Sequence, residues 1–291
     1  MKRSYIQYFT ALVLFGSNGI VASRIALSSV HIVFLRTMLG SALLVLLFFL
    51  TGHKPSAWKY PRDLIHIVIS GAAMGASWVF LFAAYGKIGV SISSLLYYCG
   101  PVFVMVLSPL LFQERLTFPK LLGFAAVLGG MICINGQAAG KLNLSGILYG
   151  GASAVLYAVM VIENKRVKHI AGIENAGIQL VFSFLTVALF ACFKTGLVFS
   201  IPANSWIWIA VLGFLNTGIG CWLYLSSISS LPVQTVAVCG YLEPALAVLF
   251  STLFLHERMT RWQILGAVLI IGGAAFGECM KYCCFSKQKS R

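Results

Sequence analysis

The feature that most constrains this chain is a succession of apolar runs, each about as long as a membrane-spanning helix. A bilayer core about 30 Å thick needs roughly 20 helical residues at about 1.5 Å each. Such runs, bounded by charge, Pro or Gly, lie at approximately 5–26, 31–51, 64–86, 90–112, 119–137, 144–162, 175–197, 206–228, 232–255 and 262–282. They lack the polar–apolar alternation of barrel strands. The sequence therefore predicts an all-α polytopic membrane protein with about ten transmembrane helices.

Composition excludes an ordinary soluble enzyme. Only 10% of the residues are charged and 59% are hydrophobic, whereas a soluble chain carries about 25% charged residues. The first run follows Lys2 and Arg3, as the core of a signal peptide does, and Val21-Ala22-Ser23 would be a passable cleavage site. Its length and the nine runs that follow favour an uncleaved first helix.

The basic residues predict the orientation of the chain. There are 21 Lys and Arg against 7 Asp and Glu, giving a formal net charge of +14. They lie mostly in short breaks between apolar runs, where positive charge sets topology, so nucleic acid is not an expected partner. Most of them fall on one side if both termini are cytoplasmic. We therefore expect an integral protein of the cytoplasmic (plasma) membrane, in contact with the lipid bilayer.

Neither metal nor cofactor is predicted. The eight cysteines fall mostly inside apolar runs, where they behave as small buried hydrophobes. Cys279, Cys283 and Cys284 near the end can form a metal or lipid site, although a free cytosolic trio beside Lys281 is the simpler interpretation. The chain has no GxxxxGK[ST] phosphate loop, so nucleotide is not expected either.

A repeat relates the two halves of the chain. A set of residues in the fourth and fifth runs returns at a constant shift of 143 residues. The first copy is Pro101, Glu114-Arg115, Thr117, Gly123 and Gly129-Gly130, and the second is Pro244, Glu257-Arg258, Thr260, Gly266 and Gly272-Gly273. We expect a five-helix repeat at 1–140, a second at 141–282 and a basic cytoplasmic tail at 283–291. Because five is odd, the second repeat is inverted in the membrane, as in many secondary transporters.

These motifs resemble the EamA-type branch of the drug/metabolite transporter superfamily. They include Phe15-Gly16-Ser17-Asn18, Phe34-Leu35-Arg36, Gly100-Pro101, Glu243-Pro244 and the doubled Glu-Arg-x-Thr. The resemblance covers essentially the whole chain. It implies a ten-helix carrier with cytoplasmic termini that moves amino acids, nucleosides, sugars or similar metabolites, often outward. Small multidrug-resistance relatives couple to protons through a first-helix glutamate, but this chain has Asn18 in that neighbourhood.

Two charged residues are expected within spans. Glu243 lies about 11 residues into its run, roughly 16 Å deep, where an ionisable group is a functional candidate by default. It can be a proton-coupling and substrate-binding carboxylate or one member of a structural pair with Arg36; both interpretations stay open. Arg36 can clamp a substrate carboxylate or bond to a neighbouring helix.

Prolines and aromatic residues suggest where a substrate binds. Pro101 and Pro244 free the carbonyls of Tyr97 and Gly240 and can act as hinges that frame a cavity. The aromatic and amide candidates for substrate contact, beside Tyr97, are Trp78, Tyr98, Trp222, Tyr241 and Asn18. Aromatic faces favour apolar bodies and amines. Glu114 and Glu257, in short loops, are interpreted as helix caps.

The sequence predicts a secondary transporter that works by alternating access. Its partner would be a small polar or amphipathic metabolite, with an amino acid or amine favoured. We expect export, with protons as a candidate coupling ion. The alternative is a membrane-embedded enzyme acting on lipid or isoprenoid substrates. The scattered histidines and the single aspartate, Asp63, argue against an enzyme.

Overall fold

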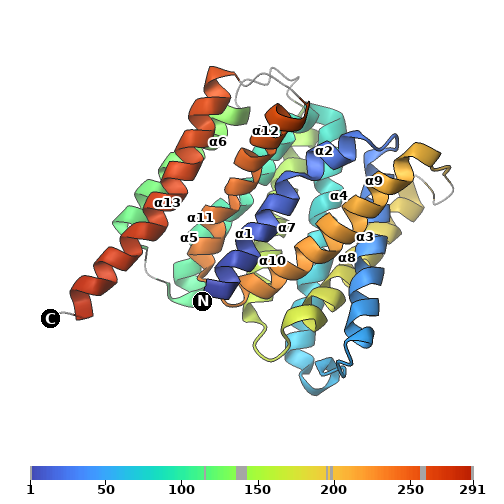
Figure 1. Cartoon of the computed structure of the whole chain (residues 1–291), viewed down its shortest axis with the longest axis horizontal. Coiled ribbons are helices and arrows are strands. Elements are labelled where there is room, and N and C mark those ends of the chain that lie inside the picture. The colour runs from blue at the N-terminus through green and yellow to red at the C-terminus, as the bar shows by residue number, and fades with distance from the viewer. Residues whose placement is uncertain are drawn as a thin grey trace.

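The computed structural model describes residues 2–114, 116–135, 143–194, 196, 199–255 and 260–289, with no side chains described at 91, 135, 251, 255 and 277–289. Every element in these ranges is helical (Figure 1). The first half contains α1 (Lys2–Gly16), α2 (Asn18–Ser23), α3 (Ser29–Leu50), η1 (Ala57–Lys59), α4 (Pro61–Tyr97), α5 (Gly100–Phe112) and α6 (Phe118–Asn135).

The second half has the same plan. It contains α7 (Leu144–Arg166), α8 (Gly172–Lys194), η2 (Ala203–Ser205), α9 (Trp206–Ala210), the π-helical segment η3 (Val211–Ile219), α10 (Gly220–Ile228), α11 (Val233–Gly240), α12 (Leu242–Leu255) and α13 (Arg261–Lys289). α13 continues past the predicted end of its span at residue 282.

Polar side chains mark where several helices begin. The Asn143 amide oxygen accepts from the backbone N–H groups of Ser145 and Gly146 at 3.0 and 3.3 Å and caps α7. Thr260 and Gln263 form a reciprocal capping box at α13, with bonds of 2.9 and 3.2 Å. These caps satisfy N–H groups that have no partner within the helix.

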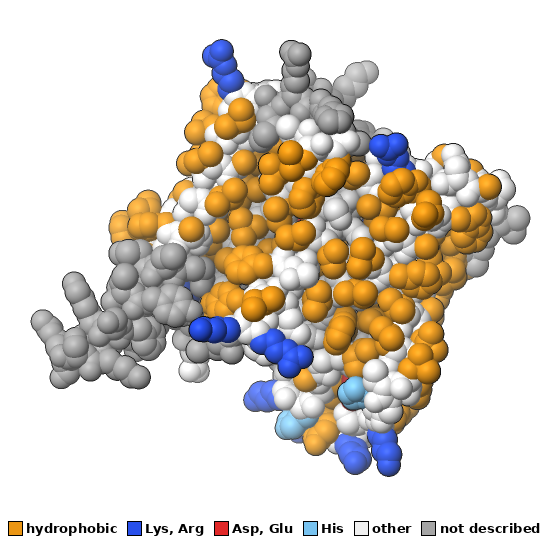
Figure 2. All heavy atoms as spheres, viewed as in Figure 1, with side chains coloured by type: hydrophobic (Ala, Val, Ile, Leu, Met, Phe, Trp, Pro, Cys, Tyr) orange, Lys and Arg blue, Asp and Glu red, His pale blue; other side chains and the backbone are white. Residues whose placement is uncertain are grey.

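The membrane-spanning character predicted from the sequence is confirmed. Within the described residues, eight helical stretches are long and apolar enough to cross a bilayer, and Phe118–Ile134 and Arg261–Phe276 are shorter apolar helices. Apolar side chains cover the middle of the face shown in Figure 2, and most of the visible Lys and Arg lie at its lower edge. The N- and C-termini lie toward that same end in Figure 1.

The helical breaks fall inside or between the predicted spans. Gly89 separates the third and fourth spans within α4, with φ 78° and ψ 164°, a conformation that glycine adopts without steric cost. The fourth span is interrupted again at Tyr98 and Cys99, and the ninth at Tyr241. Each of these two interruptions lies two or three residues before a proline, Pro101 or Pro244. The first span breaks at Ser17, which the sequence analysis did not predict.

Helix packing repeats when the two halves are exchanged. α3 packs on its counterpart α8 and α6 on its counterpart α13, and the interrupted fourth span packs on the interrupted ninth through α5 and α11. Other contacts occur in matched pairs: α1 packs on α12 as α5 does on α7, and α3 packs on η3 as α4 does on α8. This pattern is what an approximate twofold relationship between halves requires.

Two close glycine contacts between α6 and α13 repeat in the same way. A Cβ atom added to Gly130 would lie 2.6 Å from the carbonyl oxygen of Gly266, and one added to Gly273 would lie 2.6 Å from that of Gly123. Gly123 and Gly266, like Gly130 and Gly273, differ by the 143-residue shift. Glycine is therefore what allows these two helix backbones to touch.

Candidate substrate-binding site

Arg36 is held by two neighbouring helices. Its Nε donates to Thr217 Oγ1 at 3.0 Å, and its guanidinium lies 4.6 Å from the centre of the Trp78 ring. Thr217 is in the π-helical segment η3, where its hydroxyl also donates to the Leu212 carbonyl at 2.8 Å. π-helical turns often occur at functional sites. The structure thus brings together Arg36 and Trp78, both named from the sequence.

Asn18 lies at the break in the first span. The Asn216 amide nitrogen lies 2.8 Å from the Leu14 carbonyl, 2.9 Å from Ser17 Oγ and 3.0 Å from Asn18 Oδ1, and donates to all three. The break therefore has a polar partner on η3. Asn18, a candidate for substrate contact from the sequence, accepts a hydrogen bond from a neighbouring helix in this structure.

Tyr98 and Tyr241 meet where the fourth and ninth spans are interrupted. The Tyr241 hydroxyl donates to the Tyr98 carbonyl at 2.5 Å, and the two ring centres are 6.2 Å apart. We expected freed carbonyls at Tyr97 and Gly240, but the bonded carbonyl belongs to Tyr98. The reason is that Val102 donates to the Cys99 carbonyl instead, at 3.0 Å, so the Tyr98 carbonyl is left for a side chain.

A cluster of tyrosines extends from this point. The Tyr97 ring lies 5.4 Å from Tyr98 and 5.4 Å from Tyr157. The Tyr157 and Tyr224 hydroxyls are hydrogen-bonded at 3.0 Å, and the Tyr224 ring stacks on Tyr8 at 5.5 Å. The contacts that place Tyr97 in this cluster are therefore made by its ring.

Sequence reasoning missed Thr217, Tyr8, Tyr157 and Tyr224. A phenol hydroxyl within a span needs a hydrogen-bond partner, so mid-span tyrosines were a usable signal. Trp222 was predicted to line the site, but it packs against the main core, and no ring contact with these tyrosines occurs within the described residues.

Glu243 is in the first turn of α12, next to the interruption at Tyr241. It interacts electrostatically with Arg36 and with several of the clustered tyrosines. Both Glu243 and Arg36 keep part of their surface accessible. Among the described residues, Arg36 and Glu243 make no direct ion pair with each other or with a third group. The site therefore contains two opposite charges that do not touch.

Polar bonds hold the connection from α10 to α11, at the end where the termini lie. The Glu114 carboxylate caps α11 by accepting from the N–H groups of Val233 at 2.7 Å and Gln234 at 3.1 Å. The Lys165 ammonium donates to the carbonyls of Ile228, Ser229 and Leu231 at the end of α10.

Glu257, the counterpart of Glu114, and the cysteines at 279, 283 and 284 lie outside the residues whose side chains are described. Elsewhere in the described residues, His, Cys, Asp and Glu form no group that could hold a metal.

Fold and site together define a class: a helical membrane protein with two like halves and opposite charges within its spans, the construction of a secondary transporter. The chain belongs to the EamA-like transporter family, whose profile matches residues 2–136 and again 144–276. The resemblance drawn from the motifs is thereby confirmed, and the protein is a transporter.

Relatives carry the same assignment. The uncharacterized transporter YxxF of Bacillus subtilis is 26% identical over 279 residues, 93% of this chain and 88% of its own. The threonine/homoserine exporter RhtA of Escherichia coli is 22% identical over 268 residues, 90% of this chain and 81% of its own. A protein crystal structure with 20% identity has a TM-score of 0.81 and covers 95% of this chain and 98% of its own, which establishes the same fold.

Proposed function

We propose that this transporter is a secondary carrier that exports an amino acid across the cytoplasmic membrane by alternating access. The observation that carries the proposal is the pair of separated, partly accessible charges at Arg36 and Glu243. A zwitterionic amino acid presents a carboxylate to a guanidinium and an ammonium to a carboxylate. A molecule of this kind satisfies both protein charges at once.

The aromatic side chains favour the same substrate class. An ammonium group is attracted to the faces of Trp and Tyr rings, by about 0.5–2 kcal/mol per contact. Trp78 and the clustered tyrosines supply such faces, whereas a sugar phosphate would require several fixed positive groups. Arg36 alone does not supply them. An amine without a carboxylate would use only the Glu243 side of the site.

The matched helix contacts support alternating access. In carriers built from inverted repeats, exchanging the conformations of the halves opens the site first to one side and then to the other. The interruptions near Pro101 and Pro244 provide places for the helices to bend. The bonds made by Glu114 and Lys165 would close the cytoplasmic end in the present state and break when that end opens.

Glu243 is the proposed coupling residue. A carboxylate in the bilayer interior is stabilised by taking up a proton, by binding a cation or by pairing. If a proton and the substrate ammonium compete for Glu243, release of one favours binding of the other. RhtA, named as an exporter of threonine and homoserine, supports an amino acid as cargo and export as the direction.

Counterflow in proteoliposomes tests the proposal. Vesicles preloaded with an unlabelled neutral amino acid should accumulate the same labelled amino acid, and vesicles preloaded with a sugar phosphate should not. Arg36→Gln should abolish counterflow, whereas Lys194→Gln, at the exposed end of α8, should leave it intact. Counterflow of a sugar phosphate that survives Arg36→Gln would overturn the assignment of the substrate class.

A further inference from the structure

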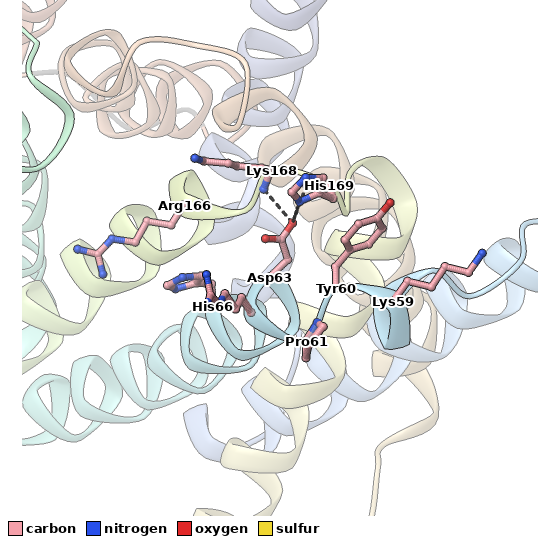
Figure 3. Close-up of a pocket in the computed structure, with 9 residues that line it drawn as sticks. Lys59, Tyr60, Pro61, Asp63, His66, Arg166, Lys168 and His169 are labelled. Atoms are coloured by element: carbon pink, nitrogen blue, oxygen red, sulfur yellow. Dashed lines mark hydrogen bonds and ion pairs between the residues drawn. The ribbon is translucent and has the colours of Figure 1, made fainter.

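A basic cavity of about 470 Å³ lies away from the candidate substrate site, at the end of the bundle where the termini lie. It is formed by η1, the start of α4 and the connection from α7 to α8 (Figure 3). Four Lys and Arg side chains line it, from Lys59, Arg62, Arg166 and Lys168. Nothing in the transport proposal uses this cavity.

The acidic groups at the cavity are already bonded. The Asp63 carboxylate accepts from the backbone N–H groups of Lys168 at 3.0 Å and His169 at 2.5 Å, as the dashed lines in Figure 3 indicate. Glu163, just outside the lining, contacts Arg166 at 2.8 Å and His66 at 2.5 Å. The Asp63 carboxylate also lies 3.2 Å from the His169 ring nitrogen Nδ1, so both carboxylates already have partners among the neighbouring groups.

Three cations remain without an acidic partner. Within the described part of the chain, Lys59, Arg62 and Lys168 form no ion pair. In Figure 3, Lys168 and Arg166 extend to the same side of Asp63, while Lys59 extends to the opposite side. The cavity thus has an excess of positive charge that an anion would balance.

The walls are fixed by contacts that do not involve a ligand. The Tyr60 and His169 rings stack in parallel, 4.5 Å apart and inclined by 6°. Glu174 on α8 accepts from the backbone N–H groups of Ser56 and Ala57 at 2.6 and 2.8 Å and so anchors η1. A preformed cavity of this kind binds a ligand with little ordering cost.

The surroundings indicate which anion fits. Ile65 and Ile69, one helical turn apart on α4, are 58% and 42% exposed, and Trp58 on η1 is 83% exposed. These residues place an apolar surface and an interfacial aromatic beside the cations. A phospholipid can therefore put its phosphate in the cavity and lay an acyl chain along α4, which a free phosphate cannot do.

We propose that this cavity binds a phosphate-bearing ligand, the head group of an anionic phospholipid, and that Arg62 and Lys168 hold its phosphate. Arginine and lysine in pockets at membrane surfaces bind such head groups through charge and hydrogen bonds. The site holds a lipid between α4 and the α7–α8 connection and does not depend on the identity of the transported substrate.

Native mass spectrometry of the purified full-length chain tests the site. Detergent-solubilised protein is titrated with phosphatidylglycerol, with phosphatidylcholine and, in a separate arm, with glycerol phosphate. The test variant is Arg62→Ala/Lys168→Ala, and the control variant Arg3→Ala/Lys54→Ala removes the same charge from exposed positions outside the cavity. All four positions are exposed, so neither variant disturbs the core.

Wild type and control should bind phosphatidylglycerol more tightly than phosphatidylcholine, and the test variant should lose roughly 30-fold in affinity, about fivefold per basic side chain. Equal losses in both variants would overturn the proposal, because the effect would then be one of net charge. Binding of glycerol phosphate as tight as that of phosphatidylglycerol, and equally sensitive to the test variant, would support a phosphate site and overturn the lipid as its occupant.

Discussion

The hydroxyl of Tyr241 donates a hydrogen bond to the backbone carbonyl of Tyr98, at 2.5 Å. The two residues are separated by 143 residues, the same shift that relates the repeated motifs. Equivalent points of the two halves therefore meet, and the bond joins the interrupted fourth span to the interrupted ninth. A substitution that removes this bond therefore removes a direct contact between the two halves.

Tyr241→Phe should destabilise the protein by about 1–3 kcal/mol, because it leaves a carbonyl in an apolar interior without a donor. Tyr98→Phe is the matched control, since it removes a hydroxyl from the counterpart residue and keeps the bonded carbonyl. Thermal unfolding in detergent would show a lower midpoint for Tyr241→Phe alone. Equal midpoints for the two variants would show that the bond contributes nothing.

Gly130→Ala should separate α6 from α13. The added methyl group would lie 2.6 Å from the Gly266 carbonyl oxygen, so the helices must move apart, at a cost of about 1–3 kcal/mol. Gly129→Ala is the control, because no atom lies within 4 Å of its added Cβ. Urea or thermal unfolding of both variants measures the difference, and an equally stable Gly130→Ala protein would contradict the close packing.

The fold was predictable because apolar length and the 143-residue repeat are properties of the sequence itself. The helical membrane class and the family follow from them, and both are confirmed. The break at Ser17 and the π-helical segment Val211–Ile219 were not predicted. Neither contains a proline, and both depend on bonds between distant segments, such as Asn216 with Leu14, which no local pattern records.

Glu243→Gln should insert normally and lose transport driven by a pH gradient, while exchange of substrate for substrate persists. Glutamine has nearly the same shape but cannot take up a proton. Flux with and without an imposed gradient in proteoliposomes separates the two activities. Gradient-driven flux at the wild-type rate would remove the coupling role.

If Glu243 serves only to balance Arg36, a different result is expected. Each single replacement, Glu243→Gln or Arg36→Gln, would then lower stability, and the double replacement would restore it. A double-mutant cycle on unfolding midpoints distinguishes this structural role from coupling.

Trp78→Ala should raise the KM for transport roughly 3- to 30-fold, because it removes the ring beneath Arg36 and an aromatic face of the proposed site. Trp206→Ala is the control, since this side chain is 53% exposed at the start of its helix. Initial rates over a range of substrate concentrations give KM for each variant. An unchanged KM with Trp78→Ala would place the substrate elsewhere.

Lys165→Met should loosen the connection between α10 and α11, since three carbonyls lose their donor. We expect faster labelling of the buried Cys239 by a membrane-impermeant maleimide, in a chain whose other cysteines are replaced. Arg166→Met, which alters an exposed neighbour, should label at the original rate. Equal rates in both variants would indicate that Lys165 does not keep this end closed.

The candidate site was only partly predictable, for a physical reason. A single sequence indicates which residues are unusual in a membrane, and Arg36, Glu243 and Trp78 were identified in this way. It does not give the rotation of each helix about its axis. Trp222 and Tyr224 are two positions apart on α10, yet only Tyr224 enters the tyrosine cluster. Packing between helices decides which of the two meets the other tyrosines.

The counterpart of Glu243 in the first repeat is Gly100, and a Cβ there would lie 2.6 Å from the Tyr157 ring. The same position of the repeat therefore differs between the halves. In the second half it holds a carboxylate, and in the first it holds a glycine that leaves room for a phenol ring. The two halves have the same plan, but the proposed site has a carboxylate at this position in the second half and a phenol ring beside the equivalent position in the first. A substrate bound at the proposed site would therefore meet a carboxylate on the side of the second half and a phenol ring on the side of the first.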